Sequence, residues 1–346
     1  MKCLVVGAGS IGRRHVRNLQ ALDLGPLSVC ETDVMARESV SREFGIKGYG
    51  RLADALAAGP DAVFVCTPTH EHLPVAGAAL GAGAHVFIEK PLAASLAGIA
   101  ELIAEARARC RTVLVGCNMR FHPGVAMLKA ALDQHVVRRP LYFRARFSHY
   151  LPNWRPGSDY RLCYSARRDQ GGGIMLEGVH EVDYLRWLGG EVERVAGSVA
   201  HLSDLDIDGE DYALVMLQFE SGAVGQIHLD YLSPVKLRGC EIVGEDGRLC
   251  WTSEGKNPEV VRVHRNTGPG GSQEDLYRCD AYDSNLMYVE EMKHFVACLS
   301  GSVKPALDLM GAERVLALAL EARAAADAGG GWRNLVVRTV KQKVST

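Results

Sequence analysis

The sequence opens with a glycine pattern whose spacing suits the binding of a dinucleotide. The segment Gly7-Ala-Gly-Ser-Ile-Gly12 has the spacing G-x-G-x-x-G, follows a valine-rich run and precedes a helical pattern, and Glu31 lies 19 positions after its last glycine. Such glycines allow a close backbone approach to a pyrophosphate at a helix N-terminus, and the acidic residue accepts hydrogen bonds from the adenosine ribose. Because glycine makes up 37 of the 346 residues, the spacing alone is a weak signal, and its context favours a dinucleotide site over a structural turn.

The acidic residue and its neighbours bear on which dinucleotide binds. The carboxylate of Glu31 would repel a 2′-phosphate, so NAD is favoured over NADP. Arg13 and Arg14, directly after the third glycine, are the residues that would instead favour NADP. We therefore predict NAD as the cofactor and NADP as the less favoured one.

Two further polar segments follow expected strands, at the edge of the sheet where ligands of such folds bind. The run Thr-Pro-Thr-His70-Glu-His72 follows one strand, and Glu89-Lys90-Pro follows another. The two histidines are two positions apart and no further cluster of ligands accompanies them, so we predict no metal site there. A lysine is usually a solvated charge, but at this edge Lys90 is a candidate for contact with a hydroxyl or carbonyl of the substrate.

A run of three glycines, 171–173, leads into an apolar helical pattern that carries Glu177, His180 and Tyr184. Residues at these spacings share one face of a continuous helix. A carboxylate beside an imidazole fixes its tautomer and raises its basicity, which suits the abstraction of a proton from an alcohol. The other interpretation is a buried helix whose histidine only completes a hydrogen-bond network.

The elements that must position these residues fall into two halves, and the first half alternates short apolar runs with helical patterns. This alternation predicts βαβ units and a doubly wound, six-stranded parallel sheet of the Rossmann type. Helices are predicted at 71–81 and 92–110, the second opening just after Pro91. The predicted strands are 3–6, 27–30, 62–66, 86–88 and 112–115, with a weak one near 46–49.

Beyond residue 120 the strands become longer and alternate apolar with polar residues, which predicts antiparallel pairing. Helical patterns at 174–188, 284–299 and 309–328 are enough to cover one face of an open sheet and leave the other free for a homo-oligomer interface. We predict a Rossmann domain over 1–120 and an α+β domain for substrate binding and oligomerisation over 121–346. The predicted strands are 141–149, 212–219, 225–232, 237–243 and 248–252.

Length and composition limit the classes of protein to consider. A chain of 346 residues favours two domains, and 47% hydrophobic with 23% charged residues is typical of a globular protein. The formal charge of −2 supplies no cationic field for nucleic acid. No apolar run is long enough for a membrane span, no secretory signal is recognisable and the ten cysteines form no C-x-x-C pair, so we predict reduced cysteines and a cytoplasmic location.

Together these residues resemble the Gfo/Idh/MocA family of oxidoreductases, relatives of glucose-fructose oxidoreductase and inositol dehydrogenase, over nearly the whole chain. The glycines of segment 7–12 match its cofactor fingerprint, Lys90 matches the lysine of its Glu-Lys-Pro motif, and His180 matches the histidine of its glycine-run helix. One departure is that the family's helix usually carries an Asp four residues before the histidine, whereas Glu177 precedes His180 by three.

The resemblance adds residues to the predicted site. The segment Gly-Cys-Asn118-Met-Arg120-Phe looks like the family's lining of the cofactor and substrate cleft, and segments 151–156 and 159–161 look like a bacterial subgroup associated with surface-polysaccharide pathways. Predicted cofactor contacts are Gly7, Gly9, Ser10, Ile11, Gly12, Glu31, Thr67, Pro68, His72, Glu89, Lys90 and Asn118. Predicted substrate contacts are Lys90, Asn118, Arg120, Trp154, Tyr160, Arg161, His180 and Tyr184.

The activity that this resemblance implies is NAD-dependent oxidation or reduction of a small-molecule carbohydrate, namely a sugar, a polyol or a nucleotide sugar. The predicted catalytic residues are Lys90, His180 and Glu177, with His180 accepting the hydroxyl proton and Lys90 polarising the same oxygen. A homodimer or homotetramer is expected. Two alternatives stay open: an NAD-dependent glycosidase of the same fold, which needs no added NAD, and an NAD-binding regulator without catalytic activity.

Overall fold

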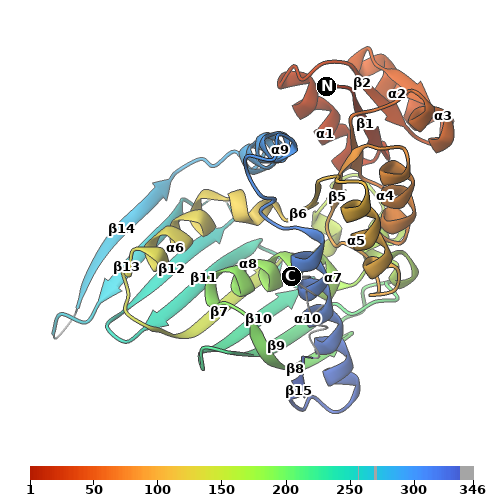
Figure 1. Cartoon of the computed structure of the whole chain (residues 1–346). Helices are drawn as coiled ribbons and strands as arrows, with labels where there is room; N and C mark the ends of the chain where they lie inside the picture. The colour runs from red at the N-terminus through yellow and green to blue at the C-terminus, as the bar shows by residue number, and fades with distance from the viewer. Residues whose placement is uncertain (256, 269–270, 336–346) are drawn as a thin grey trace, which may run out of the picture.

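A computed structural model describes residues 1–255, 257–268 and 271–335 of the chain (Figure 1). Its first sheet has six parallel strands in the order β3-β2-β1-β4-β5-β6, which confirms the predicted Rossmann topology. All six strands end at one edge, so the segments that follow β1, β2, β4 and β5 meet there. The strands are β1 Cys3–Val6, β2 Leu27–Cys30, β3 Lys47–Tyr49, β4 Ala62–Val65, β5 His85–Glu89 and β6 Val113–Gly116.

Helices connect these strands on both faces of the sheet, as the alternating pattern predicts. The helix expected to open just after Pro91 begins later, at Ile99, and this expectation was wrong. Gly98 precedes that helix with a φ of +84°, a conformation that a glycine adopts readily, and it separates the helix from the buried segment that follows Lys90. The helices are α1 Ser10–Ala21, α2 Val34–Phe44, α3 Leu52–Ala57, α4 His72–Gly81 and α5 Ile99–Ala108.

The second sheet has nine strands in the order β14-β13-β12-β11-β7-β10-β9-β8-β15. All neighbouring pairs are antiparallel except β7 and β10, which run parallel, so the prediction of a mostly antiparallel sheet is confirmed. Strands β8, β13, β14 and β15 were not predicted. The strands are β7 Pro140–Ser148, β8 Val192–Ala200, β9 Tyr212–Phe219, β10 Val224–Asp230, β11 Leu237–Gly244, β12 Gly247–Glu254, β13 Glu259–Arg265, β14 Ser272–Cys279 and β15 Arg333–Asn334.

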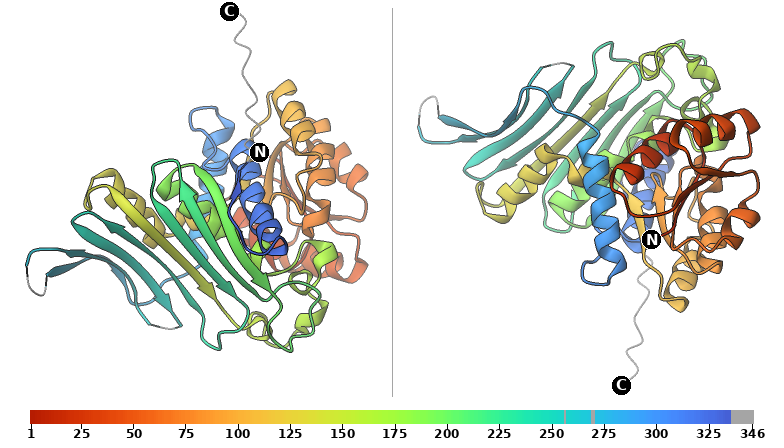
Figure 2. Two further views of the ribbon diagram at one scale, coloured as in Figure 1. Left: turned by 90° about the horizontal axis from the view of Figure 1, so that it is seen from below. Right: turned by 90° about the horizontal axis from the view of Figure 1, so that it is seen from above.

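Three helices cover one face of this second sheet: α6 (Pro123–Asp133), α8 (Val179–Gly189) and α10 (Leu309–Asp327). Figure 2 shows α6 and α8 behind the sheet, whose other face is turned to the viewer in the left panel. The helices expected at 174–188 and 309–328 thus lie where predicted, although the first is interrupted.

The helix expected at 284–299 does not cover the second sheet, which corrects that prediction. This helix, α9 (Leu286–Leu299), lies beside α1 (Figure 1). Its Phe295 packs edge-on against Phe64 of β4 and Phe87 of β5, at centroid distances of 5.4 and 5.8 Å. The apolar side chains of the first sheet therefore bury one side of this helix, although it lies far along the sequence.

In the part of the chain that the structure describes, no helix combines the length and the apolar character that crossing a membrane requires.

Candidate active site

The glycine loop between β1 and α1 is built for close backbone contact. Gly7 has a φ of +98°, and a Cβ there would lie 2.6 Å from the carbonyl oxygen of Cys66. A Cβ on Gly12 would lie 1.9 Å from the carbonyl oxygen of Gly7, so Gly12 allows α1 to pack on the loop. Gly9 precedes α1, and no side chain caps the helix there. The first amides of α1 are therefore available to an anion in the cleft.

Glu31, directly after β2, is held in place by backbone amides. Its carboxylate accepts hydrogen bonds from the amide of Ala8, at 2.8 Å, and from the amide of Asp33, at 3.0 Å. Of the two arginines that could favour NADP, Arg13 pairs with Glu43 at 2.8 Å and does not line the cleft. Arg14 lines the cleft, and its guanidinium lies 4.4 Å from the ring centroid of Tyr288.

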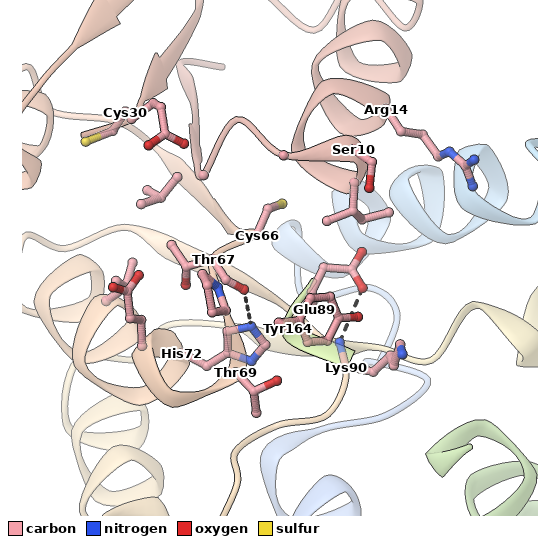
Figure 3. A pocket seen from close by; sticks show the side chains of 18 of the residues that line it. Ser10, Arg14, Cys30, Cys66, Thr67, Thr69, His72, Glu89, Lys90 and Tyr164 are labelled. Atoms are coloured by element: carbon pink, nitrogen blue, oxygen red, sulfur yellow. Dashed lines mark hydrogen bonds between the residues drawn. The ribbon is translucent and has the colours of Figure 1, made fainter. Parts of the chain in front are cut away.

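A cleft of about 860 Å³ is lined by residues of the glycine loop and by His180 of α8. Figure 3 shows the part of its lining around Thr67, Glu89 and Lys90. Of the predicted cofactor contacts, Gly12 alone does not line it, because this residue packs behind Gly7. His180, predicted to contact the substrate, lines the other end. The predicted cofactor contacts in the lining are Gly7, Gly9, Ser10, Ile11, Glu31, Thr67, Pro68, His72, Glu89, Lys90 and Asn118.

The imidazole of His72 joins two strand ends. Its nitrogens lie 2.9 Å from the carbonyl oxygen of Thr67 and 2.8 Å from that of Pro91, as Figure 3 shows for Thr67. Burial lowers the pKa of His72. Both ring nitrogens thus face carbonyl groups instead of a free coordination site. Within the described residues, no group of three or more His, Cys, Asp or Glu side chains could hold a metal ion.

Glu89 connects the end of β5 with α1. Its carboxylate lies 2.5 Å from Nε2 of the buried His15, and it accepts a hydrogen bond of 3.3 Å from the amide of Lys90. These two contacts of Glu89 fix the backbone from which the Lys90 side chain enters the cleft.

Lys90 forms an ion pair with Glu177 that joins the two domains. Lys90 Nζ lies 2.7 Å from Oε2 of Glu177, and Ser165 Oγ donates to Oε1 of Glu177 at 3.0 Å. Burial alone would lower the pKa of Lys90, but the Glu177 carboxylate outweighs it and raises that pKa. Burial alone would raise the pKa of Glu177, but the charge of Lys90 and its hydrogen bond outweigh burial and lower that pKa. Both groups are therefore charged at pH 7.

The predicted contact between Glu177 and His180 is wrong. The prediction assumed one continuous helix, whereas α7 (Ile174–Glu177) ends before Gly178 and α8 begins after it. A Cβ on Gly178 would lie 2.6 Å from Cδ1 of Leu229, so β10 packs closely against this interruption. Glu177 consequently faces Lys90 and not the imidazole of His180.

His180 lies at the start of α8 and lines the cleft. Its Nδ1 is buried and has no hydrogen-bond partner among the described residues. Burial, together with the positive charges of Arg238 and Lys90, lowers the pKa of His180 well below its ordinary value of 6.5. The ring is therefore neutral at pH 7 and able to accept a proton.

Two of the predicted substrate contacts lie outside the cleft because they take part in buried pairs. Tyr184 is fully buried, and its hydroxyl donates to the carbonyl oxygen of Gly239 at 3.4 Å. Arg120 makes a bidentate pair with Asp183 at 2.7 and 2.8 Å. Both side chains thus stabilise the packing of α8, and neither faces the cleft.

The predicted contacts in the segment after β7 also lie outside the cleft. Trp154 Nε1 donates to the carbonyl oxygen of His149, and the Tyr160 hydroxyl accepts from the amide of Asp206. These two aromatic residues line a neighbouring cavity of about 290 Å³. Arg161 is exposed and pairs with Asp159 at 2.7 Å.

The cleft lining also contains polar residues that were not predicted as contacts: Arg14, Thr32, Thr69, Glu71, Arg155, Tyr164 and Tyr288. Arg14 adjoins the glycine loop, where it was considered only as a partner for a 2′-phosphate. Arg155 and Tyr164 belong to a segment of short 3₁₀ turns, and Tyr288 belongs to α9. Their positions depend on how distant segments fold together, so periodicity gave no signal for them.

The residues present fit a bound dinucleotide. The uncapped start of α1 suits a pyrophosphate, and the glycines around it leave room for backbone contact. Glu31 points a fixed carboxylate to the end of the cleft where an adenosine ribose would bind, and Arg13, engaged by Glu43, does not offset its charge.

Comparisons with known proteins agree with this geometry. A family model described as an oxidoreductase family with an NAD-binding Rossmann fold matches residues 1–117, and a model of the GFO/IDH/MocA C-terminal domain matches residues 125–250. The chain is 28% identical over 316 residues to the myo-inositol 2-dehydrogenase of Thermotoga maritima, with 89% of this chain and 90% of the relative covered. It is 30% identical over 330 residues to an inositol 2-dehydrogenase of Pseudomonas savastanoi pv. phaseolicola, with 89% and 85% covered.

Among solved structures, levoglucosan dehydrogenase in complex with NADH and L-sorbose is similar with a TM-score of 0.85 at 17% identity, covering 97% of this chain and 99% of that one. At that identity the likeness concerns the fold alone.

Proposed function

Because the chain belongs to the Gfo/Idh/MocA family of oxidoreductases, whose N-terminal domain is an NAD-binding Rossmann fold, we propose that it transfers a hydride between NAD and a hydroxyl-bearing carbon of a sugar or polyol. One observation carries the proposal. Lys90, directly after β5, and His180, at the start of α8, line the same cleft as the glycine loop, and the two lie close enough for the charge of Lys90 to lower the pKa of His180. The names of the inositol dehydrogenase relatives support the class of substrate.

The chain's own residues would hold the cofactor along the Rossmann edge. The first amides of α1 bind the pyrophosphate, Glu31 accepts hydrogen bonds from the adenosine ribose, and the cleft leads on to Lys90. When bound, NAD supplies the hydride chemistry that amino-acid side chains cannot.

Lys90 and His180 would have different roles at the substrate oxygen. The neutral imidazole of His180 accepts the hydroxyl proton as the alcohol is oxidised. The ammonium group of Lys90 donates a hydrogen bond to the same oxygen and stabilises the negative charge that develops on it. In the reverse direction His180 returns the proton to the carbonyl oxygen.

Glu177 would act through Lys90 instead of through His180. Its carboxylate accepts from Lys90 Nζ and Ser165 Oγ, so both of its oxygens are engaged. The pair keeps Lys90 protonated and oriented even though the side chain is only 15% exposed. We therefore assign Glu177 as a positioning residue for Lys90.

The test of this function is a screen of polyols, aldoses, uronates and nucleotide sugars for NAD reduction, followed at the absorbance band of NADH. The proposal predicts net formation of NADH from added NAD with at least one member of the panel. Release of an aglycone from a glycoside without added NAD would instead identify the glycosidase alternative. Tight NAD binding with no turnover of any compound would identify the regulator.

A homodimer or homotetramer is a second part of the proposal. No described helix covers the face of the second sheet opposite α6, α8 and α10, and apolar side chains lie on it, such as Met216 and Val224 with exposed fractions of 43% and 47%. A second copy of the chain could bury this face. Light scattering should give a multiple of 37.5 kDa at micromolar concentration, and a mass of one chain would contradict this part.

We further propose that residues 1–120 bind the cofactor and residues 121–346 supply the substrate side, with α9 packed against the first domain. A cytoplasmic location belongs to the same proposal. Its support is that all ten cysteines are free in the structure, which suits a reducing compartment. The role in surface-polysaccharide metabolism stays a prediction from the sequence.

A further inference from the structure

Arg155 is a half-buried cation at the substrate end of the cleft. It lies between the 3₁₀ turns Leu151–Asn153 and Tyr160–Leu162 and lines both the main cleft and the smaller neighbouring cavity. Among the described residues, no carboxylate pairs with its guanidinium. The donors of this guanidinium are therefore open to an anionic ligand in the cleft.

Three other cations near this end of the cleft have a carboxylate partner. Lys90 pairs with Glu177, as described above, and Arg238 pairs with Glu181 at 2.7 Å. Within the same segment of 3₁₀ turns, Arg167 lies 3.7 Å from Asp169. With His180 neutral, Arg155 is therefore the source of an uncompensated positive charge at the substrate end.

The surroundings of Arg155 orient its guanidinium. Its Cζ lies 5.8 Å from the centroid of the Tyr164 ring, within the range of a cation–π contact. Tyr164 also lines the cleft, and Figure 3 shows its ring beside Lys90. Burial and the charge of Glu177 raise the pKa of Tyr164, so this ring is uncharged and does not neutralise the arginine. Arg155 thus stands at the Lys90 end of the cleft, away from Glu31.

We propose that Arg155 binds an anionic group of the substrate, a carboxylate or a phosphate, while the reacting hydroxyl lies at Lys90 and His180. A guanidinium offers parallel N–H donors that match the two oxygens of either group. The substrate class is then an acidic sugar or polyol: a uronate-type compound or a sugar phosphate. This inference rests on the proposed function, and it specifies the substrate of the same site.

The test measures binding, so that it does not depend on turnover. The probes are D-glucose, D-galactose and D-mannose, each compared with its uronate and its 6-phosphate, titrated calorimetrically into the protein saturated with NADH. For the wild type, the best anionic member should bind at least about tenfold more tightly than its neutral parent, as expected for charge-assisted hydrogen bonds. The uronate and phosphate arms distinguish the two sources of negative charge.

Two variants complete the test. In Arg155→Gln the preference for the anionic member should fall to about twofold or less, and Arg155→Lys should retain part of it, because lysine keeps the charge but not the fork of donors. Arg167→Gln is the matched control, since Arg167 lies in the same segment, is exposed and lines no part of the cleft. It should keep the preference of the wild type.

Two outcomes would overturn the inference about Arg155. One is a wild type that binds no anionic member more tightly than its neutral parent, or a preference that survives in Arg155→Gln. The other is an Arg155→Gln variant whose only change is NAD binding weakened by about tenfold or more, which would assign Arg155 to a cofactor phosphate. A protein that shows the predicted preference but reduces NAD with no sugar or polyol would contradict the proposed function and leave the anion site standing.

Discussion

We expect the two ends of the cleft to hold their ligands by different physical means. At the Rossmann end the contacts come from backbone amides, glycines and one carboxylate held by two amides. At the α8 end they come from side chains: Lys90, in an ion pair with Glu177, and His180, whose pKa is lowered by burial and by the charges of Arg238 and Lys90. A backbone site keeps its geometry when side chains change, whereas the properties of a charged cluster depend on every member.

We therefore expect each end of the cleft to control a different property of the enzyme. Substitutions at the Rossmann end should alter cofactor affinity and selectivity, and substitutions at the α8 end should alter turnover and its pH dependence while NAD affinity is preserved. A residue at one end that changed the property assigned to the other would break the separation.

The largest effect is expected for His180→Ala. The loss of a general base typically lowers a rate by about 10² to 10⁴, so kcat should fall in that range while the NAD dissociation constant changes by less than about threefold. Steady-state kinetics and a fluorescence titration with NADH measure the two quantities. His70→Ala, which removes an exposed histidine outside the cleft, is the control and should keep full activity. Retention of more than about a tenth of kcat in His180→Ala would place the base elsewhere.

Glu177→Gln is expected to have the next largest effect. Removing the carboxylate leaves Lys90 without its anionic partner, and misplacement of Lys90 should lower kcat by about tenfold to hundredfold. Because Glu177 raises the pKa of Lys90, its loss should also move the alkaline limb of the kcat profile to lower pH.

Glu177→Asp keeps the charge and should restore the position of the alkaline limb at least in part. A Glu177→Gln enzyme whose pH profile matches the wild type would show that Glu177 has only a structural role.

Glu31→Ser tests the Rossmann end. The substitution removes both the acceptor for the ribose hydroxyls and the charge that opposes a 2′-phosphate, so the ratio of NADP to NAD affinity should rise by about tenfold or more with kcat little changed. Calorimetric titration with both cofactors gives the ratio. If the wild type already prefers NADP, then Glu31 is not the determinant, and Arg14, which lines the cleft, becomes the residue to test.

The same contrast explains which residues of the candidate site could be predicted from the sequence. The residues predicted to contact the cofactor follow the ends of strands, so local spacing placed Glu31 and Lys90 at one edge correctly. Of the twelve predicted cofactor contacts, only Gly12 is set back from the cleft. At the α8 end, an interruption at Gly178 turned Glu177 away from His180, and no helical period encodes such a break. Arg155 reaches the cleft only through tertiary packing of irregular turns, which sequence patterns do not describe.

The pH dependence of the wild type is a milder test of the charged cluster. Burial and two nearby cations lower the pKa of His180, so the base form persists as the pH falls below 6.5. The acid limb of kcat/KM should therefore lie below pH 6.5, and in Arg238→Met, which removes one of those cations, it should move to higher pH. An acid limb above 7 in the wild type would contradict the neutral, buried imidazole.

The smallest effect is expected for Tyr184→Phe. Tyr184 was predicted to contact the substrate, but its hydroxyl makes one long hydrogen bond to a backbone carbonyl in the core. Its loss should cost about 0.5–1.5 kcal/mol of stability at most and change kcat and KM by less than about twofold. Thermal unfolding and steady-state kinetics check both values. A tenfold change in KM would indicate that Tyr184 contacts the substrate.

The central claim is that Lys90 acts on the substrate oxygen during hydride transfer, and single-turnover formation of NADH by Lys90→Met tests it most directly. The best substrate from the screen is mixed with enzyme saturated with NAD, and circular dichroism confirms that the variant is folded. If Lys90 stabilises the charge on that oxygen, the rate should be lower than that of the wild type by about 10² to 10⁴, with the NAD dissociation constant within about threefold. A folded variant that transfers the hydride at more than about a tenth of the wild-type rate would contradict the account.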